Sequence, residues 1–371
     1  MFRKIVIASD SFKGSVSSSE VAEAAEAAIM SCLPECICTK VSIADGGEGT
    51  MESLCSALGA GIVRIKAHDP LMRIIDVTYA INDDTAIIEM SKASGLPLLK
   101  PEERNPMLTS TYGTGEMIKV ALDRGCRKIL VGIGGSATND AGTGMLNALG
   151  VEFQDKDGTC LPGIGSSLSE IERIDLSGLD SRLQDTAITV ACDVDTPFCG
   201  PDGAAYVFAP QKGATPLQVK MLDEGMAHFA DIIEKTTGRG FRSISGTGAA
   251  GGLGGAFLSI LGAKLKSGID MVLDTVKFND VINDADLVIT GEGKMDFQTP
   301  KGKTAAGVLQ RARKAGIPVI ALAGKVDMCP ELESMGFQQI IEVSKGLPLE
   351  KAMDPDTTKA NIKNALVTFL S

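Results

Sequence analysis

Short apolar runs rich in isoleucine and valine recur along this chain and alternate with helical segments near both ends. Each run is bounded by glycine, aspartate or serine, a pattern typical of buried strands in a largely parallel sheet. Ser17 and Glu20 form a capping-box pattern at the start of one predicted helix. The predicted strands are residues 4–8, 39–43, 86–90, 129–133, 188–191, 287–289, 318–322 and 339–343, and the predicted helices are residues 17–31, 115–124, 140–149, 216–235 and 304–315.

This alternation predicts an α/β fold of the doubly wound class. The middle of the chain differs, because the apolar runs 62–66, 74–80 and 86–90 follow one another without helices and therefore indicate antiparallel pairing. At 371 residues we expect two α/β domains, one Rossmann-like with a parallel sheet and one with a mixed sheet inserted in it. The active site is expected in the cleft between them. The predicted domains are residues 1–62 with 263–371, and residues 63–262.

The charge balance and the cysteines limit the partners and the compartment. There are 36 basic and 47 acidic residues, so the net charge is −11, and the chain lacks the basic stretch of a nucleic-acid binder. The uncharged stretch 243–263 is long enough to span a bilayer, but its glycines favour a loop that leads into a buried helix.

The start of the chain reaches Asp10 too soon for the apolar region of a signal peptide. The nine cysteines include no CxxC pair, which favours reduced, mainly structural thiols. We therefore expect a cytoplasmic protein with no membrane or nucleic-acid partner. The oligomeric state stays open, and a homo-oligomer is one alternative.

Carboxylates and glycine turns directly follow five of the predicted strands. Ligands of open α/β sheets bind outside the carboxyl ends of the strands, so these segments define the candidate site. Ordinary turn chemistry explains any one of them, but five together indicate a functional site. The five segments are residues 9–14, 45–50, 134–142, Asp193 and residues 290–296.

Two glycine-rich loops have the form of an anion-binding nest. Residues 134–140 and 245–252 combine paired or alternating glycines with small hydroxyl side chains. Successive backbone N–H groups that end at a helix N-terminus bind phosphate well. We favour phosphate binding over close helix packing as the reason for these glycines.

The carboxylates at the strand ends would repel one another unless a cation neutralised them. Mg²⁺ is suited to this task, because it prefers one or two carboxylates together with phosphates and water. Glycine nests, carboxylates and a few lysines are the components of phosphoryl transfer. Both histidines, His68 and His228, lie outside these loops, so we expect a carboxylate to accept the hydroxyl proton.

Known nucleotide motifs are only partly matched. A Walker loop fails because Phe297 stands where a glycine would have to precede Gly302-Lys303-Thr304, and the protein-kinase signatures are absent. Residues 132–137 satisfy GxGxxA after a predicted strand, which leaves an NAD-dependent dehydrogenase of a small hydroxy acid open. A non-catalytic protein that closes around a small acid is the other alternative.

Taken together, the motifs resemble the bacterial glycerate kinase family of the glycerate 2-kinase type, over essentially the whole chain. The resemblance implies transfer of the ATP γ-phosphate to D-glycerate with Mg²⁺, two α/β domains that enclose a cleft, and usually the 2-hydroxyl as acceptor. The motifs are residues 9–14, 44–50, 113–116, 132–142, 191–194, 210–214, 246–252 and 289–293.

The strand-end loops and this resemblance together give a site hypothesis. Asp10, Lys13 and Asp45 are the predicted catalytic residues, and one of the two aspartates accepts the proton of the glycerate hydroxyl. The predicted substrate-binding residues are Ser11, Gly46, Gly47, Glu48, Arg104 and Lys212. The predicted ATP-binding residues are Gly134, Gly135, Ser136, Ala137, Thr138, Asn139, Gly246, Gly248, Gly251, Gly252, Gly291 and Lys303. The predicted Mg²⁺ ligands are Asp193, Glu292 and Asp296.

Overall fold

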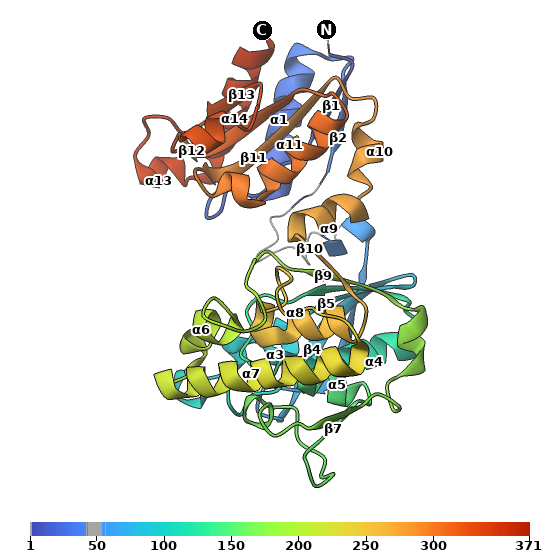
Figure 1. The fold of residues 1–371 in the computed structure, drawn as a ribbon. Coiled ribbons are helices and arrows are strands. Elements are labelled where there is room, and N and C mark those ends of the chain that lie inside the picture. Colours follow the sequence, from blue (N-terminus) through green and yellow to red (C-terminus); the bar gives the residue numbers. More distant parts are fainter. Residues whose placement is uncertain (1, 42, 44–53, 56) are drawn as a thin grey trace. The chain divides into compact units, whose positions relative to one another are not determined.

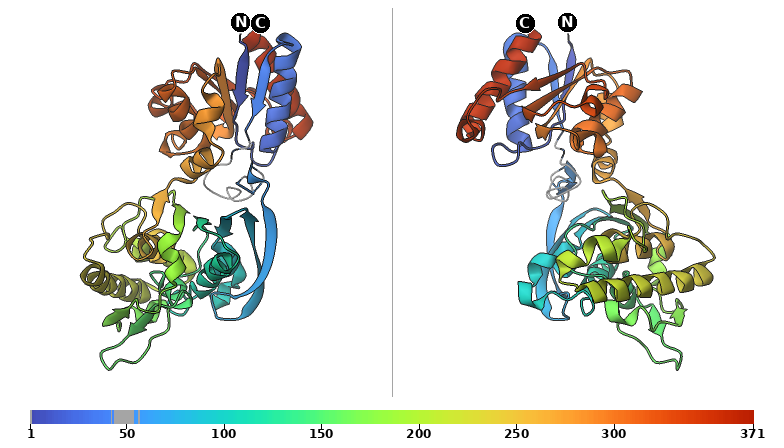
Figure 2. Two further views of the ribbon diagram at one scale, coloured as in Figure 1. Left: turned by 90° about the vertical axis from the view of Figure 1, so that its right-hand side faces the viewer. Right: turned by 60° about the vertical axis from the view of Figure 1, so that its left-hand side comes forward.

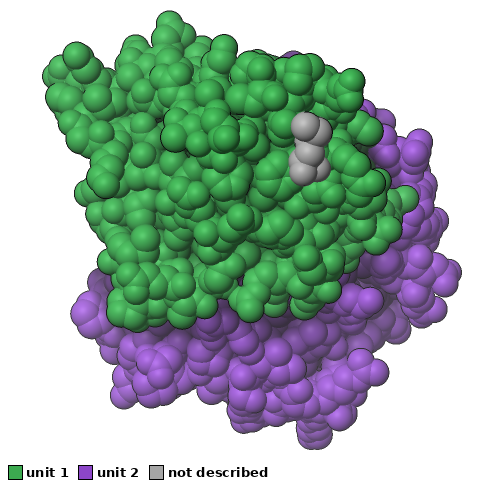
Figure 3. Space-filling model, turned by 90° about the horizontal axis from the view of Figure 1, so that it is seen from above, with its two compact units in different colours: residues 1–58, 267–371 green, residues 59–266 purple. Residues whose placement is uncertain are grey.

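The computed structural model divides the chain into two compact units, which are coloured separately in Figure 3. Unit 1 contains residues 1–58 and 267–371, and unit 2 contains residues 59–266, so the second unit interrupts the first in sequence. The structure describes residues 2–41, 43, 54, 55 and 57–371.

Unit 1 is built on a five-stranded sheet whose strands are all parallel. Their order across the sheet is β13-β12-β11-β1-β2. Strands from the two ends of the chain are thereby paired, and Ile7 of β1 lies opposite Ile289 of β11. The strands are β1 (Lys4–Ile7), β2 (Ile37–Lys40), β11 (Leu287–Met295), β12 (Val319–Val326) and β13 (Gln339–Glu342).

Helices cover both faces of this sheet (Figures 1 and 2). Because successive strand residues point to opposite faces, β12 contributes to two cores. Ile320 and Leu322 pack with residues of α1 (Ser18–Cys32) and α14 (Pro355–Leu370). Ala321 and Ala323 pack instead with Ala305 of α11 (Thr304–Lys314). The remaining helices of the unit are α9 (Gly268–Thr275), α10 (Phe278–Ile282), α12 (Pro330–Glu333), α13 (Leu349–Ala352) and the 3-10 turn η6 (Thr299–Lys301).

The first helix starts where the sequence predicts. Ser17 caps α1 by accepting a hydrogen bond from the backbone N–H of Glu20 at 3.3 Å. The Glu20 carboxylate accepts the Ser17 N–H in return at 2.9 Å, which completes the predicted capping box.

Unit 2 is built on a six-stranded mixed sheet with the order β10-β9-β6-β5-β4-β3. The first hairpins, β3–β4 and β4–β5, are antiparallel, as predicted from the closely spaced apolar runs. The remaining pairs are parallel. The strands are β3 (Gly61–His68), β4 (Ile74–Asn82), β5 (Thr85–Glu89), β6 (Lys128–Gly132), β9 (Ala187–Ala191) and β10 (Lys264–Lys266).

A separate two-stranded sheet and several helices complete unit 2. The small sheet pairs β7 (Glu152–Gln154) with β8 (Arg173–Asp175) in antiparallel fashion. The helices are α3 (Ser91–Ser94), α4 (Tyr112–Asp123), α5 (Thr143–Ala148), α6 (Ala204–Phe208), α7 (Pro216–Thr237) and α8 (Ala249–Ser259). The 3-10 turns are η1 (Leu96–Leu98), η2 (Pro101–Glu103), η3 (Gly165–Ser167), η4 (Ser181–Asp185) and η5 (Pro210–Lys212). The α/β class, with a parallel sheet in one unit and a mixed sheet in the other, is confirmed.

The uncharged stretch 243–263 forms a loop followed by the buried helix α8. This agrees with the prediction of a glycine loop leading into a buried helix. The helix is interrupted near its start, where Ala250, Gly251 and Gly252 have positive φ angles. Within the described residues, no helix has both the length and the apolar character needed to cross a membrane.

Candidate active site

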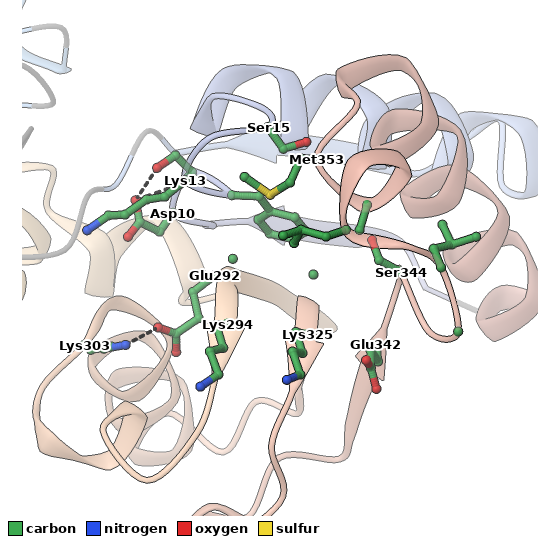
Figure 4. A pocket seen from close by; sticks show the side chains of 18 residues that line it. Asp10, Lys13, Ser15, Glu292, Lys294, Lys303, Lys325, Glu342, Ser344 and Met353 are labelled. Carbon is green, nitrogen blue, oxygen red and sulfur yellow. Dashed lines mark hydrogen bonds and ion pairs between the residues drawn. The ribbon is translucent and has the colours of Figure 1, made fainter.

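The carboxyl ends of the unit 1 strands meet at a pocket with a volume of about 630 Å³ (Figure 4). In this sheet β2 follows β1 on one side, whereas β11, β12 and β13 extend on the other. The direction of the strand order therefore changes between β1 and β11, which is where open α/β sheets bind ligands. The pocket is lined by residues that follow β1 and by residues at the ends of β11, β12 and β13.

Glu292 is the most strongly perturbed acid of this pocket. It lies in β11 with only 5% of its surface exposed, and the Lys303 ammonium is 3.5 Å from its Oε2. Burial raises the pKa of Glu292 to about 7, although Lys303 favours the charged carboxylate. The negative charge of Asp10 adds to the upward shift. Its Oε1 is buried and accepts no hydrogen bond from the described residues.

Asp10 lies directly beyond β1, at the neighbouring strand end. Its side chain is almost fully buried, and its Oδ1 accepts the backbone N–H of Ser11 at 2.6 Å. The backbone N–H of Asp10 donates to the carbonyl oxygen of Gly291 at 3.0 Å, which fixes this loop to β11. Asp10, Ser11 and Lys13 all line the pocket (Figure 4).

Asp296, a predicted Mg²⁺ ligand, is held in a turn after β11. Its Oδ1 accepts the backbone N–H of Gln298 at 2.9 Å, and the Lys294 ammonium is 3.0 Å from its Oδ2. The hydrogen bond from Gln298 and the contact with Lys294 lower the pKa of Asp296. This carboxylate therefore already has partners within the protein.

The third predicted Mg²⁺ ligand, Asp193, belongs to unit 2, where it is exposed directly beyond β9. The described part of the chain contains no group of three or more His, Cys, Asp or Glu side chains that could hold a metal ion. The metal-binding role of Asp193, Glu292 and Asp296 stays a prediction.

Gly291, predicted to bind ATP, lies inside the sheet. A Cβ at this position would collide with the carbonyl oxygen of Leu322 and would lie 2.9 Å from the Ser9 Oγ. Close packing of β11 between β1 and β12 is therefore sufficient to require glycine here. Its role in ATP binding stays a prediction.

In unit 2, Gly134 and Gly135 follow β6 and are exposed. Among the described residues, no atom lies within 4 Å of the position that a Gly134 Cβ would occupy. Gly135 has a φ angle of +72°, which favours glycine. The backbone at these two residues is thus open to a ligand, whereas the next four predicted ATP-binding residues, Ser136, Ala137, Thr138 and Asn139, are buried.

The helix N-terminus beyond this loop already holds a side chain of the protein itself. The helix α5 begins only at Thr143, and Asp140 occupies its N-terminus. The Asp140 carboxylate accepts the N–H groups of Gly142 and Gly144 at 3.2 and 3.1 Å, and of Thr111 at 2.8 Å. The Asp140 carboxyl group thus already occupies these N–H groups, and phosphate binding by this part of the loop stays a prediction.

Lys212, a predicted substrate ligand, is buried beneath the same loop. Its ammonium donates to the Ser136 Oγ at 2.7 Å and to the Thr138 carbonyl oxygen at 2.6 Å. Burial lowers the pKa of Lys212 to about 7, and the charge of Asp140 opposes this shift. Lys212 therefore holds the loop from inside.

The second glycine-rich loop is tightly packed. A Cβ on Gly251 would collide with the carbonyl oxygen of Thr138, and a Cβ on Gly248 would collide with that of Pro197. Gly252 approaches the backbone of Ala141 in the same way, and Gly246 approaches the sulfur of Cys192. Close packing, the alternative to phosphate binding, is therefore sufficient to require glycine at these positions. Their role in ATP binding stays a prediction.

The other five predicted site residues are Asp45, Gly46, Gly47, Glu48 and Arg104. Asp45, Gly46, Gly47 and Glu48 lie outside the described residues. Arg104 is in unit 2, directly after the turn η2, and its buried Nε makes no hydrogen bond with the described residues.

Sequence reasoning missed the far end of the unit 1 pocket. Lys325, Glu342, Ser344 and Met353 also line it. A signal for Glu342 and Ser344 is present in the sequence, because both stand at the end of the predicted strand 339–343, where open α/β sheets bind ligands. No comparable signal marks Met353 in the sequence.

The dinucleotide-binding alternative loses its structural basis. The GxGxxA pattern requires a strand–helix–strand unit within one parallel sheet. The strand that follows β6 along the chain is β7, which pairs with β8 in a separate sheet. An acidic residue beyond β7 consequently cannot take the place that the fingerprint requires.

The fold and the pocket define an α/β protein that presents acidic and basic side chains at the ends of parallel strands. The chain belongs to the glycerate kinase family, because the model of that family matches residues 5–369. This confirms the resemblance seen in the motifs.

Proteins with related sequences and structures agree with this assignment. The chain is 46% identical over 355 residues to a glycerate kinase of Bacillus subtilis, covering 95% of this chain and 93% of that protein. It is 44% identical over 325 residues to the glycerate 2-kinase of Escherichia coli, covering 87% and 85%. A crystal structure from Salmonella typhimurium LT2, provisionally named glycerate kinase 2, matches with a TM-score of 0.87 and 39% identity. That match covers 99% of this chain and 97% of the other.

The raised pKa of Glu292 predicts a pH-dependent stability. The folded state binds this proton more tightly than the unfolded state, whose pKa is near 4.5. The free energy of unfolding should therefore fall as the pH rises from about 4.5 to about 7. Glu292→Gln should remove this contribution, which is on the order of 3 kcal/mol at pH 8.

Urea unfolding of the two proteins between pH 5 and 8, followed by circular dichroism, measures this difference. Glu333→Gln, at an exposed glutamate of the same unit, is the matched control, and its curve should parallel that of the unaltered protein. Parallel curves for Glu292→Gln as well would contradict the prediction.

Proposed function

We propose that this protein catalyses the ATP-dependent phosphorylation of D-glycerate, with the 2-hydroxyl as acceptor. The observation that carries the proposal is the unit 1 pocket, which brings Asp10, Lys13, Glu292 and Lys303 together in a chain of the glycerate kinase family. The 2-hydroxyl is supported by the similarity to the Escherichia coli glycerate 2-kinase. No observation favours the dehydrogenase or the binding protein.

In this proposal Asp10 is the general base. The glycerate hydroxyl oxygen forms a bond to the γ-phosphorus, and the bond from that phosphorus to the β–γ bridging oxygen breaks. The bridging oxygen leaves with its electron pair as part of ADP, and the hydroxyl proton passes to the Asp10 carboxylate. A carboxylate suits this role because it can accept the proton that the hydroxyl loses as the phosphoryl group is transferred.

The lysines supply positive charge to a strongly acidic protein whose two substrates are both anions. Lys13 is proposed to bind the transferring phosphoryl group or the glycerate carboxylate, and Lys303 an ATP phosphate. Their ammonium groups act at short range, where they outweigh the net charge of −11. Placed at the transferring group, a fixed cation stabilises the transition state.

Mg²⁺ is proposed to be held by Glu292. The fit rests on the buried Glu292 Oε1, which accepts no hydrogen bond from the described residues and lies in a residue that lines the pocket. A single carboxylate is sufficient, since Mg²⁺ takes its other ligands from substrate phosphates and water. When bound, Mg²⁺ would neutralise phosphate charge.

Unit 2 is proposed to contact ATP phosphates through the backbone of Gly134 and Gly135. Their exposure and the open space beside Gly134 support this assignment. Both units are thus proposed to contribute residues to the reaction. The cytoplasmic location stays a prediction.

The test of the proposed function is ADP formation by the purified protein. It should require both D-glycerate and Mg²⁺, and phosphorus NMR should identify 2-phosphoglycerate as the product. ADP formation without glycerate would contradict the proposed acceptor. The 3-phosphate as product would contradict the assignment of the hydroxyl.

Lys13→Ala should reduce kcat by about 10²–10³-fold, because it removes a charge-stabilising group from the reacting centre. Folding should persist, since Lys13 is exposed. Steady-state kinetics measure the effect, and Lys220→Ala on the exposed face of α7 is the control. A decrease smaller than about threefold would remove Lys13 from the mechanism.

Gly134→Ala should raise the KM for ATP without loss of stability. Its backbone does not need a positive φ, and the new methyl group meets no atom of the described residues within 4 Å. Only an approaching ligand would collide with it. Gly61→Ala, at a glycine that is also unstrained and has no closer neighbour than 3.9 Å, is the control. An unchanged KM for ATP would place the phosphates elsewhere.

A further inference from the structure

The unit 1 pocket is longer than a three-carbon acid requires. It crosses the carboxyl ends of four neighbouring strands, in the order β1, β11, β12 and β13. Strands in a sheet are about 4.8 Å apart, so the outer two of these four are separated by about 14 Å. Glycerate fills only a part of this length. A volume of about 630 Å³ is instead typical of sites for larger cofactors.

The pocket is lined by both charged and apolar side chains. Asp10 and Lys303 lie at one side, and Ser344 lies at the opposite side (Figure 4). The lining also includes the apolar side chains of Leu349 and Met353, both of which are exposed. A lining of this mixed kind matches a nucleoside triphosphate, whose phosphates are charged and whose base has two apolar faces.

Between the two ends, further lysines supply positive charge. Lys294 and Lys325 line the pocket at the ends of β11 and β12. Both share one acidic partner, Asp327, at 2.8 and 3.2 Å. Together with Lys303 they form a path of cations that suits a chain of phosphates.

Ser344 gives an independent sign of a ligand-binding position. Only 7% of its surface is exposed, and its Oγ is buried with no hydrogen-bond partner among the described residues. Buried hydroxyl groups are nearly always hydrogen-bonded. Since Ser344 lines the pocket, a polar atom of a bound ligand would provide the partner.

We propose that unit 1 binds the nucleoside of ATP at the β13 end of this pocket. The base lies against Leu349, the Ser344 Oγ forms a hydrogen bond with a polar atom of the nucleoside, and the phosphates extend toward Lys303 and Glu292. This inference rests on the proposed kinase function and extends it, because none of the predicted site residues was assigned to the nucleoside.

Ser344→Ala tests the hydrogen bond. The hydroxyl has no partner among the described residues, so its removal should not lower the stability. Titration calorimetry with ADP, without glycerate, should show a Kd that is raised about threefold to tenfold. The KM for ATP should rise in parallel, and the KM for glycerate should stay unchanged.

Leu349→Glu tests the contact with the base. Leu349 is 77% exposed, so the protein should fold normally, but the new carboxylate would face the base and repel the phosphates. The Kd for ADP should rise by about tenfold or more. Leu217→Glu, at a leucine of α7 in unit 2 that is 69% exposed, is the matched control and should bind ADP normally.

An unchanged Kd for ADP in both pocket variants would overturn the inference, and so would a rise in the KM for glycerate alone. ADP binding is measured without turnover, so the two proposals can fail separately. If both variants weaken ADP binding but the protein phosphorylates no glycerate, the nucleoside site stands and the proposed function fails. If the unaltered protein does not bind ADP, both fail.

Discussion

The parallel pairing of β1 with β11 joins segments from the two ends of the chain in one sheet. Their carboxyl ends therefore lie side by side. With Ile7 opposite Ile289, Asp10 and Glu292 emerge at neighbouring strand ends. The backbone hydrogen bond from Asp10 to Gly291 extends this pairing into the loop itself. A shift of the register would separate the two carboxylates, and the pocket that they line would lose its polar end. The candidate site in unit 1 thus depends on the packing of its sheet.

Two buried ionisable side chains, Glu292 and Lys212, are held in fixed positions by the fold. Glu292 is kept in a setting that favours its neutral form, with Lys303 as partial compensation. Lys212 is buried under the Gly134–Asn139 loop, and its two hydrogen bonds hold the buried part of that loop in place. Fixed groups of this kind need little rearrangement when a substrate binds, which is the basis of electrostatic preorganisation.

Glycine serves two separate purposes in this chain, and the sequence alone does not distinguish them. Gly251 and Gly291 are glycines because another backbone approaches closely. Gly134 has open space beside it, so it is free to meet a ligand. In the sequence all three belong to similar strand-end or glycine-rich segments. The difference depends on what packs against each residue, and long-range contacts decide that.

Periodicity and turn chemistry determined most of the local structure. The strands, the capped helix α1 and the antiparallel run of unit 2 follow from patterns that act over a few residues. The motifs also determined the family. Tertiary structure decided which carboxylates share a pocket, that Asp140 fills the N-terminus of α5, and that Lys212 points inward. It also revealed the β13 end of the pocket, where Ser344 belongs to the lining. These features depend on contacts between residues far apart in the chain, and a sequence pattern carries no record of such contacts.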